Sequence, residues 1–476
     1  MSNAVQHWFG AFCVVETLAL LALTVVFAVG QTPNPARDLG GDDLLSCSPA
    51  PCVLPPAQVS PGPNDVNSAV LAVNPTNPSD IIVGSNDGNC GFEGEPTTGF
   101  FVSLDRGSTW DQTCMSERSV NGQLYVPVEG PILGYDCKGD AFIGGFYVSN
   151  ESQSGIALEG FEKSSDGIHW SFPEAAVYRQ NYSPATCWMA VDSSGNSPYE
   201  GSIYIGCVMI TQIGQDDFYQ MVVSHSNDGG KSWHLANVGP RQVFPEQDFY
   251  DSITVGSDGA IYLAWQYCNQ DDDCGNGPVY MLFSKSSDGG NTWSKPTLIA
   301  QVNLIYPLPN GQPFSNVANT PAIGVDNSKG PYGGSLYVTM YNWTGTFMQV
   351  VVARSTDGGN SWSKLTPVAP GVTHDQFFPW LSVSPTGLVG VMWLDRRNDP
   401  ANVSFQAFAA ISDDGGSSFE PNVQLTQNFS NPNVGGMGNA SYNGAAWDGP
   451  NYFLAAWMDT SNGLNTQDMI GGIRLK

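Results

Sequence analysis

An eight-residue pattern, Ser-x-Asp-x-Gly-x-Ser/Thr-Trp, recurs along this chain of 476 residues and is called the box below. Four copies are complete, a fifth ends in Phe, and a sixth is one residue shorter; they span residues 103–110, 226–233, 286–293, 355–362, 412–419 and 164–170. Their aspartates lie 57 to 69 residues apart: Asp105, Asp166, Asp228, Asp288, Asp357 and Asp414. So steady a period indicates a repeat architecture.

Each residue type in the box suits a tight turn. The Asp carboxylate accepts hydrogen bonds from backbone N–H groups, the glycines adopt positive φ, and the hydroxyl groups cap the same loop. The terminal aromatic ring then anchors the turn on an apolar surface. We therefore interpret the six box aspartates as structural residues of β-hairpin corners, and not as catalytic carboxylates.

A second recurring element lies between the boxes: two short apolar strands around a turn, as in residues 252–265. Seven such hairpins occur against six boxes. A hairpin and a box together give four antiparallel strands in about 60 residues, which is the unit of a β-propeller blade. We therefore predict an all-β fold, a β-propeller of seven four-stranded antiparallel blades with six box turns.

The last repeat, residues 442–476, ends before a box or a fourth strand. Residues 56–60, which precede the first repeat, can supply that missing outer strand. Closure of the ring removes the sheet edges that a propeller would otherwise expose. The sequence therefore predicts that the N- and C-terminal segments join in the last blade.

Three regions are expected along the chain. Residues 1–30 are predicted to be a secretory signal peptide, because residues 8–29 are mostly apolar and small residues follow at 28–30. An uncleaved signal anchor is the alternative, because Glu16 interrupts the apolar run and no Lys or Arg precedes it. Residues 31–64 are expected to be a Pro- and Gly-rich linker that contains the closing strand, and residues 65–476 the propeller.

Charge and cysteine content restrict the partners and the compartment. The 44 Asp and Glu residues against 17 Lys and Arg give a net charge of −27, which excludes nucleic acid and anionic membranes as expected partners. A monomer that is secreted or displayed at the cell surface is expected. Local cysteine pairs support an oxidising compartment, and Cys137 is left over once Cys13 leaves with the signal peptide. The expected disulfides are Cys47–Cys52, Cys90–Cys114, Cys187–Cys207 and Cys268–Cys274.

The boxes and their spacing resemble the BNR or Asp-box repeats of the sialidase superfamily over residues 66–476. That resemblance implies the propeller fold, but Asp-box propellers include sialidases, xyloglucan-cleaving hydrolases, fucose-binding lectins, sorting receptors and assembly factors, so it does not decide the function. Sialidases resemble one another in a Phe-Arg-Ile-Pro stretch, three carboxylate-binding arginines and a Tyr/Glu pair. This chain has no Phe-Arg-Ile-Pro stretch and few arginines, which disfavours a true sialidase.

Candidate site residues lie on the loop face opposite the boxes, where loops lead into the first strands of the blades. Residues 241–251 and 374–380 bring acidic, basic and aromatic groups to the expected channel mouth, and residues 393–399 end a neighbouring strand. Two carboxylates in one groove suit glycoside hydrolysis, with one as proton donor. The catalytic candidates are Asp248 and Asp375, with Glu246 as a substitute. The ligand-binding candidates are Arg241, Tyr250, His374, Trp380, Asp395, Arg396 and Arg397.

One loop is a candidate calcium site, because Asp271, Asp272 and Asp273 offer oxygen ligands. A disulfide-closed acidic surface loop is the alternative, and no other cofactor is predicted. Three functions remain open at this point. The chain binds an extracellular glycan on its loop face, hydrolyses glycosides with paired carboxylates in a sialidase-like or endo-glucanase-like reaction, or serves as a scaffold for a protein ligand without catalysis.

Overall fold

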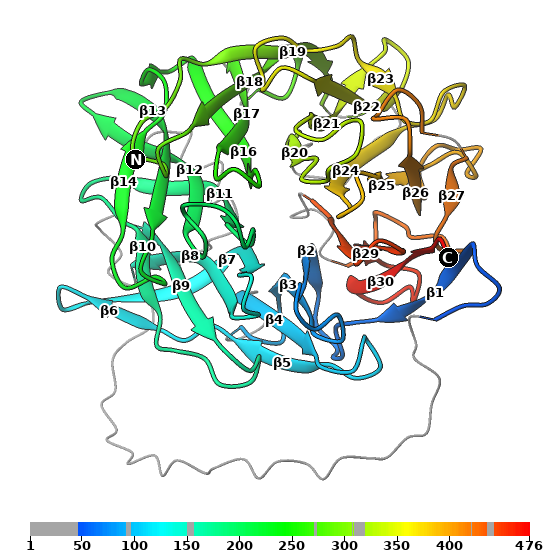
Figure 1. Cartoon of the computed structure of the whole chain (residues 1–476), viewed down its shortest axis with the longest axis horizontal. Helices are drawn as coiled ribbons and strands as arrows, with labels where there is room; N and C mark the ends of the chain where they lie inside the picture. Colours follow the sequence, from blue (N-terminus) through cyan, green and yellow to red (C-terminus); the bar gives the residue numbers. More distant parts are fainter. Residues whose placement is uncertain are drawn as a thin grey trace. The chain divides into compact units, whose positions relative to one another are not determined.

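The fold is known from a computed structural model that describes residues 46–91, 97–149, 157–270, 274–306, 308, 319–419, 421–435 and 442–476. The described residues form strands and turns without a helix, in seven antiparallel sheets. Figure 1 shows these sheets as the blades of a ring. The predicted all-β, seven-bladed propeller is confirmed. No helix among the described residues is long and apolar enough to cross a membrane.

The blades are numbered I to VII along the chain, and the first four contain these strands. Blade I contains β2 (Val66–Val73), β3 (Ile81–Asp87), β4 (Thr97–Ser103) and β5 (Asp111–Cys114). Blade II contains β6 (Arg118–Val120), β7 (Gln123–Tyr135), β8 (Ala141–Ser149), β9 (Ala157–Ser164) and β10 (Glu174–Val177). Blade III contains β11 (Ser183–Val191), β12 (Ile203–Ile213), β13 (Asp216–Ser226), β14 (His234–Asn237) and β15 (Gln242–Val243). Blade IV contains β16 (Glu246–Val255), β17 (Ile261–Asn269), β18 (Gly277–Ser286) and β19 (Thr297–Leu304).

The remaining three blades complete the ring. Blade V contains β20 (Ala322–Val325), β21 (Leu336–Trp343), β22 (Met348–Ser355) and β23 (Thr366–Pro367). Blade VI contains β24 (Gln376–Val383), β25 (Val389–Asp395), β26 (Gln406–Ser412) and β27 (Val423–Gln424). Blade VII contains β28 (Gly444–Asp448), β29 (Tyr452–Asp459), β30 (Gln467–Arg474) and, from the other end of the chain, β1 (Cys52–Gln58).

Blade VII is closed by the N-terminal segment, as the sequence predicted, but the closing strand β1 begins at Cys52 and ends at Gln58, and so overlaps the predicted 56–60 in three residues. β1 pairs antiparallel with β30, from Cys52 opposite Arg474 to Gln58 opposite Met469. Leu54 is fully buried in the hydrophobic core that this blade shares with blade I. Closure therefore combines a hydrogen-bonded ladder with burial of apolar side chains.

The box turns have the hydrogen bonds that their residue types suggested. In blade IV the Asp288 carboxylate accepts from the Thr292 N–H at 2.9 Å and the Thr292 hydroxyl at 2.6 Å, while the Ser286 hydroxyl donates to it at 2.8 Å. The glycines of this turn have φ of 72° and 92°. In blade III the hydroxyl and N–H of Ser232 lower the pKa of Asp228 to about 2. The same pattern surrounds Asp105, Asp357 and Asp414, and a shorter version surrounds Asp166.

The aromatic residue of a box packs against the preceding blade. The Trp233 ring of blade III meets Phe161 of blade II edge-on at 5.1 Å, and Trp362 of blade V meets Phe283 of blade IV at 5.4 Å. The Trp233 indole N–H also donates to the Gly230 carbonyl at 3.0 Å. The box therefore both closes its own turn and joins adjacent blades.

All four expected disulfides are present. They are Cys47–Cys52, Cys90–Cys114, Cys187–Cys207 and Cys268–Cys274, and within the described part of the chain Cys137 is the free cysteine. Cys187–Cys207 joins β11 to β12 within blade III. The pairs were predictable because each links residues of one short loop or of one blade.

Ring closure predicts different effects for neighbouring residues of β1. Leu54→Ala removes a fully buried side chain and should lower the free energy of unfolding by about 2–5 kcal/mol. Val53→Ala is the matched control, because Val53 is 39% exposed and its truncation should change stability by less than about 0.5 kcal/mol. Denaturant unfolding measures both. Equal, small effects would show that β1 does not hold the ring closed.

Candidate functional site

The predicted site residues of blade VI form a buried ionic network. The Asp375 carboxylate accepts from the Met348 N–H at 2.9 Å and the Asn402 side-chain amide at 2.8 Å. The Arg396 guanidinium lies 3.4 Å from Asp375, and burial lowers the pKa of Arg396 to about 10. Asp375 and Arg396 are both almost completely buried. They therefore tie the loops of blades V and VI together within the protein interior.

Asp395 and Arg397 form a second pair in the same blade. The Asp395 carboxylate lies 2.6 Å from Arg397 and accepts the Trp393 indole N–H at 2.7 Å. Arg397 also lies over the Phe408 ring at 4.2 Å. His374 is half-buried immediately before this blade. Asp375 and Asp395, two of the three carboxylates predicted to share one site with Asp248, are thus buried in ion pairs. A site shared by these three carboxylates stays a prediction.

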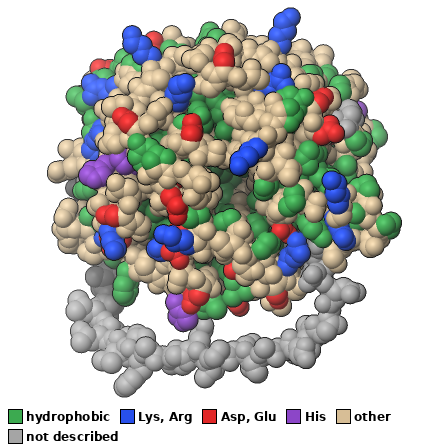
Figure 2. Space-filling model, in the orientation of Figure 1, with side chains coloured by type: hydrophobic (Ala, Val, Ile, Leu, Met, Phe, Trp, Pro, Cys, Tyr) green, Lys and Arg blue, Asp and Glu red, His purple; other side chains and the backbone are tan. Residues whose placement is uncertain are grey.

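Aromatic rings from separate blades meet at the centre of the ring. The Trp188 ring of blade III contacts the Trp380 ring of blade VI with centroids 4.2 Å apart and the planes tilted by 37°, and Tyr442 meets Trp188 edge-on at 5.2 Å. Blades III and VI are not neighbours, so these rings meet across the propeller axis. Trp380 is thus packed in an aromatic plug. Figure 2 shows the face viewed along the short axis, where hydrophobic and other uncharged side chains lie at the centre and single charged side chains of both signs lie around them.

Buried acidic side chains near this plug have carboxylate oxygens without a hydrogen-bond partner. Glu159 and Asp468 each leave one oxygen unpaired and Asp251 leaves both, while the other oxygen of Asp468 accepts from the Ser85 hydroxyl. Burial raises the pKa of each, to about 7 for Asp468. Glu159 stands within an apolar strand sequence, a signal that the sequence analysis did not use. No group of three His, Cys, Asp or Glu side chains among the described residues could hold a metal ion.

A cavity of about 250 Å³ lies between blades III and IV and is called the III–IV cavity. Its lining combines residues of both blades: Val238, Pro240, Gln242, Asp248, Trp265, Tyr267, Tyr280, Leu282 and Pro296. Of the residues predicted for catalysis or ligand binding, Asp248 is the one in this lining. It is positioned at the start of β16, opposite Tyr267 of β17.

Asp248 is the electrostatically unusual residue of the III–IV cavity. Burial raises its pKa to about 7, and the neighbouring Glu246 charge acts in the same direction. Hydrogen bonds from the side chains of Trp265 and Gln242 oppose this shift, and the Trp265 indole N–H donates to the Asp248 carboxylate at 2.9 Å. Asp248 is therefore largely protonated below pH 7, although it has an ordered hydrogen-bond donor.

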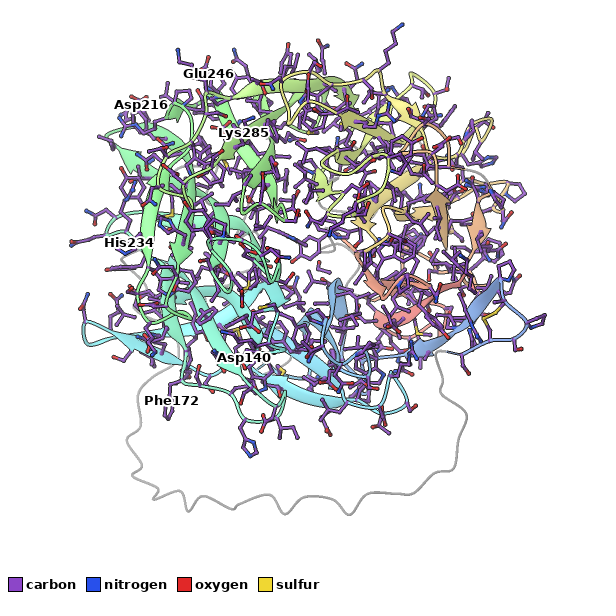
Figure 3. All side chains as sticks on the ribbon, in the orientation of Figure 1. Asp140, Phe172, Asp216, His234, Glu246 and Lys285 are labelled. Carbon is purple, nitrogen blue, oxygen red and sulfur yellow. A yellow bond between two sulfur atoms is a disulfide. The ribbon has the colours of Figure 1, made fainter. Side chains whose placement is uncertain are left out.

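Two tyrosines provide ring surface beside this acid. Tyr267 and Tyr280 are cross-strand partners in β17 and β18, with ring centroids 6.0 Å apart. Both are partly exposed, so the III–IV cavity reaches the protein surface. The Tyr267 hydroxyl is hydrogen-bonded to Glu246, the substitute acid of the prediction. Figure 3 shows Glu246 in the outer part of this sector of the ring.

The other predicted residues of this region lie outside the III–IV cavity. Arg241 is exposed, and its guanidinium stacks on Phe218 at 4.5 Å. Tyr250 is buried at a bulge of β16 with φ of 49°, and its N–H donates to the Thr186 hydroxyl at 3.2 Å. The candidate calcium ligands Asp271, Asp272 and Asp273 lie outside the described residues.

The residues that surround Asp248 were not among those predicted from the sequence. Gln242, Trp265 and Tyr280 come from β15, β17 and β18, and only the contact between two blades assembles them. The alternation of side chains in β17 places Trp265 and Tyr267 on one face of the strand, which was the available signal. It did not show which blade surface this face would meet.

Comparison with protein-family models and with curated proteins finds no match. Among solved structures, the chain is similar to an ulvan lyase described as a new family of polysaccharide lyase, with 13% identity, 83% of this chain and 92% of that chain covered, and a TM-score of 0.46. An α-L-arabinofuranosidase from Fusarium graminearum has 11% identity, coverage of 72% and 92%, and a TM-score of 0.43. A variant of the NanB sialidase from Streptococcus pneumoniae has 11% identity, coverage of 86% and 93%, and a TM-score of 0.42. Similarity this low does not indicate the activity of this chain.

The raised pKa of Asp248 predicts a pH-dependent stability. Between pH 3.8, where the unfolded Asp ionises, and about 7, the folded state retains a proton that the unfolded state has lost. Stability therefore falls with rising pH across this window, by up to about 4 kcal/mol for Asp248 alone. Asp248→Asn should remove this part of the decline.

Denaturant unfolding of the Asp248→Asn variant at pH 4 and pH 8 provides the measurement. The free energy of unfolding of the variant minus that of the wild type should be larger at pH 8 than at pH 4. The control is Asp216→Asn, because Asp216 is exposed at the start of β13. If both variants follow the wild-type pH profile, Asp248 is not a desolvated acid.

Proposed function

We propose that this chain is a secreted glycan-binding propeller whose ligand site is the III–IV cavity. The observation that carries the proposal is that one buried acid, Asp248, lines this cavity beside the ring faces of Tyr267 and Tyr280. Ligand sites typically combine aromatic lining with a few positioned polar groups. A sugar ring has both an apolar C–H face and a rim of hydroxyl groups, so it matches both parts of this lining.

Each group would have a separate role in binding. Tyr267 and Tyr280 would pack against the apolar face of a sugar ring. Protonated Asp248 would donate a hydrogen bond to a sugar hydroxyl, and the Trp265 indole N–H fixes the orientation of its carboxyl group. Because burial already keeps most water away from the Asp248 carboxyl group, a bound ligand would displace little water from it. Affinity should then fall as pH rises through about 7, when Asp248 ionises.

Secretion agrees with the covalent structure. Four disulfides are formed, as is typical of proteins from oxidising compartments. The predicted signal peptide at residues 1–30 lies outside the described residues. The proposed ligand is therefore an extracellular glycan.

Glycoside hydrolysis is the second candidate, and it is favoured by one observation. A carboxyl group with a pKa of about 7 suits a general acid that protonates a leaving-group oxygen near neutral pH. Glu246, whose charge acts on Asp248, would be the second carboxylate of the pair. Asp248→Asn should then abolish hydrolysis while binding persists.

The binding proposal predicts how Tyr280 variants behave on a glycan array and in calorimetry. Tyr280→Ala removes the ring surface and should lower affinity for the bound glycan by about tenfold. Tyr280→Phe keeps the ring and should bind within about twofold of the wild type. Reducing-end release from the same glycan, with wild type and Asp248→Asn, tests hydrolysis. If a glycan binds equally well to both Tyr280 variants, its binding site lies outside the III–IV cavity.

A further inference from the structure

The III–IV cavity is small for a whole ligand. Its volume of about 250 Å³ is below the roughly 300–1,000 Å³ of cavities that enclose drug-sized molecules. A single sugar ring would fill much of it. Any further ring of a glycan would have to lie on the surface beside the cavity.

Blade III provides an additional strand at this edge. β15 pairs with β13 near the N-terminal end of that strand, with Val243 opposite Phe218 and Gln242 opposite Tyr219. The ladder continues to the next residue, because the Phe244 N–H donates to the Asp217 carbonyl at 3.0 Å. The segment is therefore held against blade III while Gln242 lines the III–IV cavity.

The two faces of this segment differ. β15 ends at Val243 and Phe244 opens the following turn, but the Phe244 N–H continues the ladder, so the alternation of side chains is extended by one residue. It places Phe244 on the side of Gln242, and Arg241 and Val243 on the opposite side. The stacking of Arg241 on Phe218 agrees with this alternation, since Phe218 is the cross-strand partner of Val243. Phe244 is 38% exposed, so it offers ring surface on the side of the III–IV cavity.

Charges near this surface are unfavourable for an anionic ligand. Asp217 lies opposite Phe244 in the ladder, and Glu246 follows two residues later. The cation of this segment, Arg241, is on the other face and stacks on Phe218. The net charge of −27 also repels polyanions over a longer range.

We propose that Phe244 forms a second sugar-binding position at the edge of the III–IV cavity, and that the ligand is an uncharged oligosaccharide of at least two units. The inference rests on the proposed function, because the first sugar ring must occupy the cavity. The second ring would then stack on Phe244. Affinity should therefore rise between one and two sugar units.

Calorimetry with defined probes tests this inference. The probes are gluco-, xylo-, manno-, galacto- and arabino-oligosaccharides of one to six units, together with oligogalacturonates as charged probes. Phe244→Ser should lower affinity for chains of two or more units by about tenfold and leave the affinity for the matching monosaccharide unchanged. Val243→Ser is the matched control, because Val243 is 39% exposed on the opposite face and its replacement should change neither affinity.

The outcomes separate this inference from the function on which it rests. Equal behaviour of the two serine variants, or affinity that does not rise with chain length, overturns the second position, and the Tyr280 variants still report on the cavity. Tighter binding of oligogalacturonates than of neutral chains overturns the uncharged ligand. If no probe binds the wild-type protein, the proposed function is overturned and the second position with it.

Discussion

The pairing of β1 with β30 is the interaction on which the rest of the structure depends. Each blade of a closed ring packs on two neighbours. The seventh blade of this ring reaches four strands only when β1 joins β28, β29 and β30. The first strand described in the chain supplies the outer strand of the last blade. Without it, β30 would present an unpaired edge. Because the III–IV cavity lies between two blades, its walls keep their spacing only while the ring keeps its curvature.

Sequence periodicity predicted the fold because its signals are local. The box turns, the hairpins and the four disulfides each involve residues of one short loop or of one blade. Asp248 could be selected because strand register brings it to the start of β16. The burial of Asp375 by Arg396 and Asn402, and the arrival of Gln242 beside Asp248, depend on contacts between separate loops and blades. Periodicity contains no information about such contacts.

Two groups of acidic residues have opposite electrostatic environments in this protein. Turn donors stabilise the ionised box carboxylates, as the pKa of about 2 for Asp228 shows. Interior positions favour the protonated form, as for Asp248 and Asp468, whose pKa values rise to about 7. The ionised box carboxylates stabilise the folded state at neutral pH, and this contribution is lost as the pH falls from the pKa of an unfolded Asp through the lower pKa of the folded state. The buried acids destabilise the folded state increasingly as the pH rises from the pKa of an unfolded Asp to their own raised pKa. In the III–IV cavity, protonated Asp248 can donate a hydrogen bond, and Tyr267 and Tyr280 beside it provide aromatic ring surface.

A glycan is expected to enter the III–IV cavity and not the centre of the ring. Indole N–H signals in a ¹H–¹⁵N spectrum distinguish the two, because Trp265 donates to Asp248 while Trp188 and Trp380 form the central plug. If an oligosaccharide binds in the III–IV cavity, its addition should shift the Trp265 indole signal and leave those of Trp188 and Trp380 in place. Shifts of Trp188 and Trp380 with an unchanged Trp265 signal would contradict it.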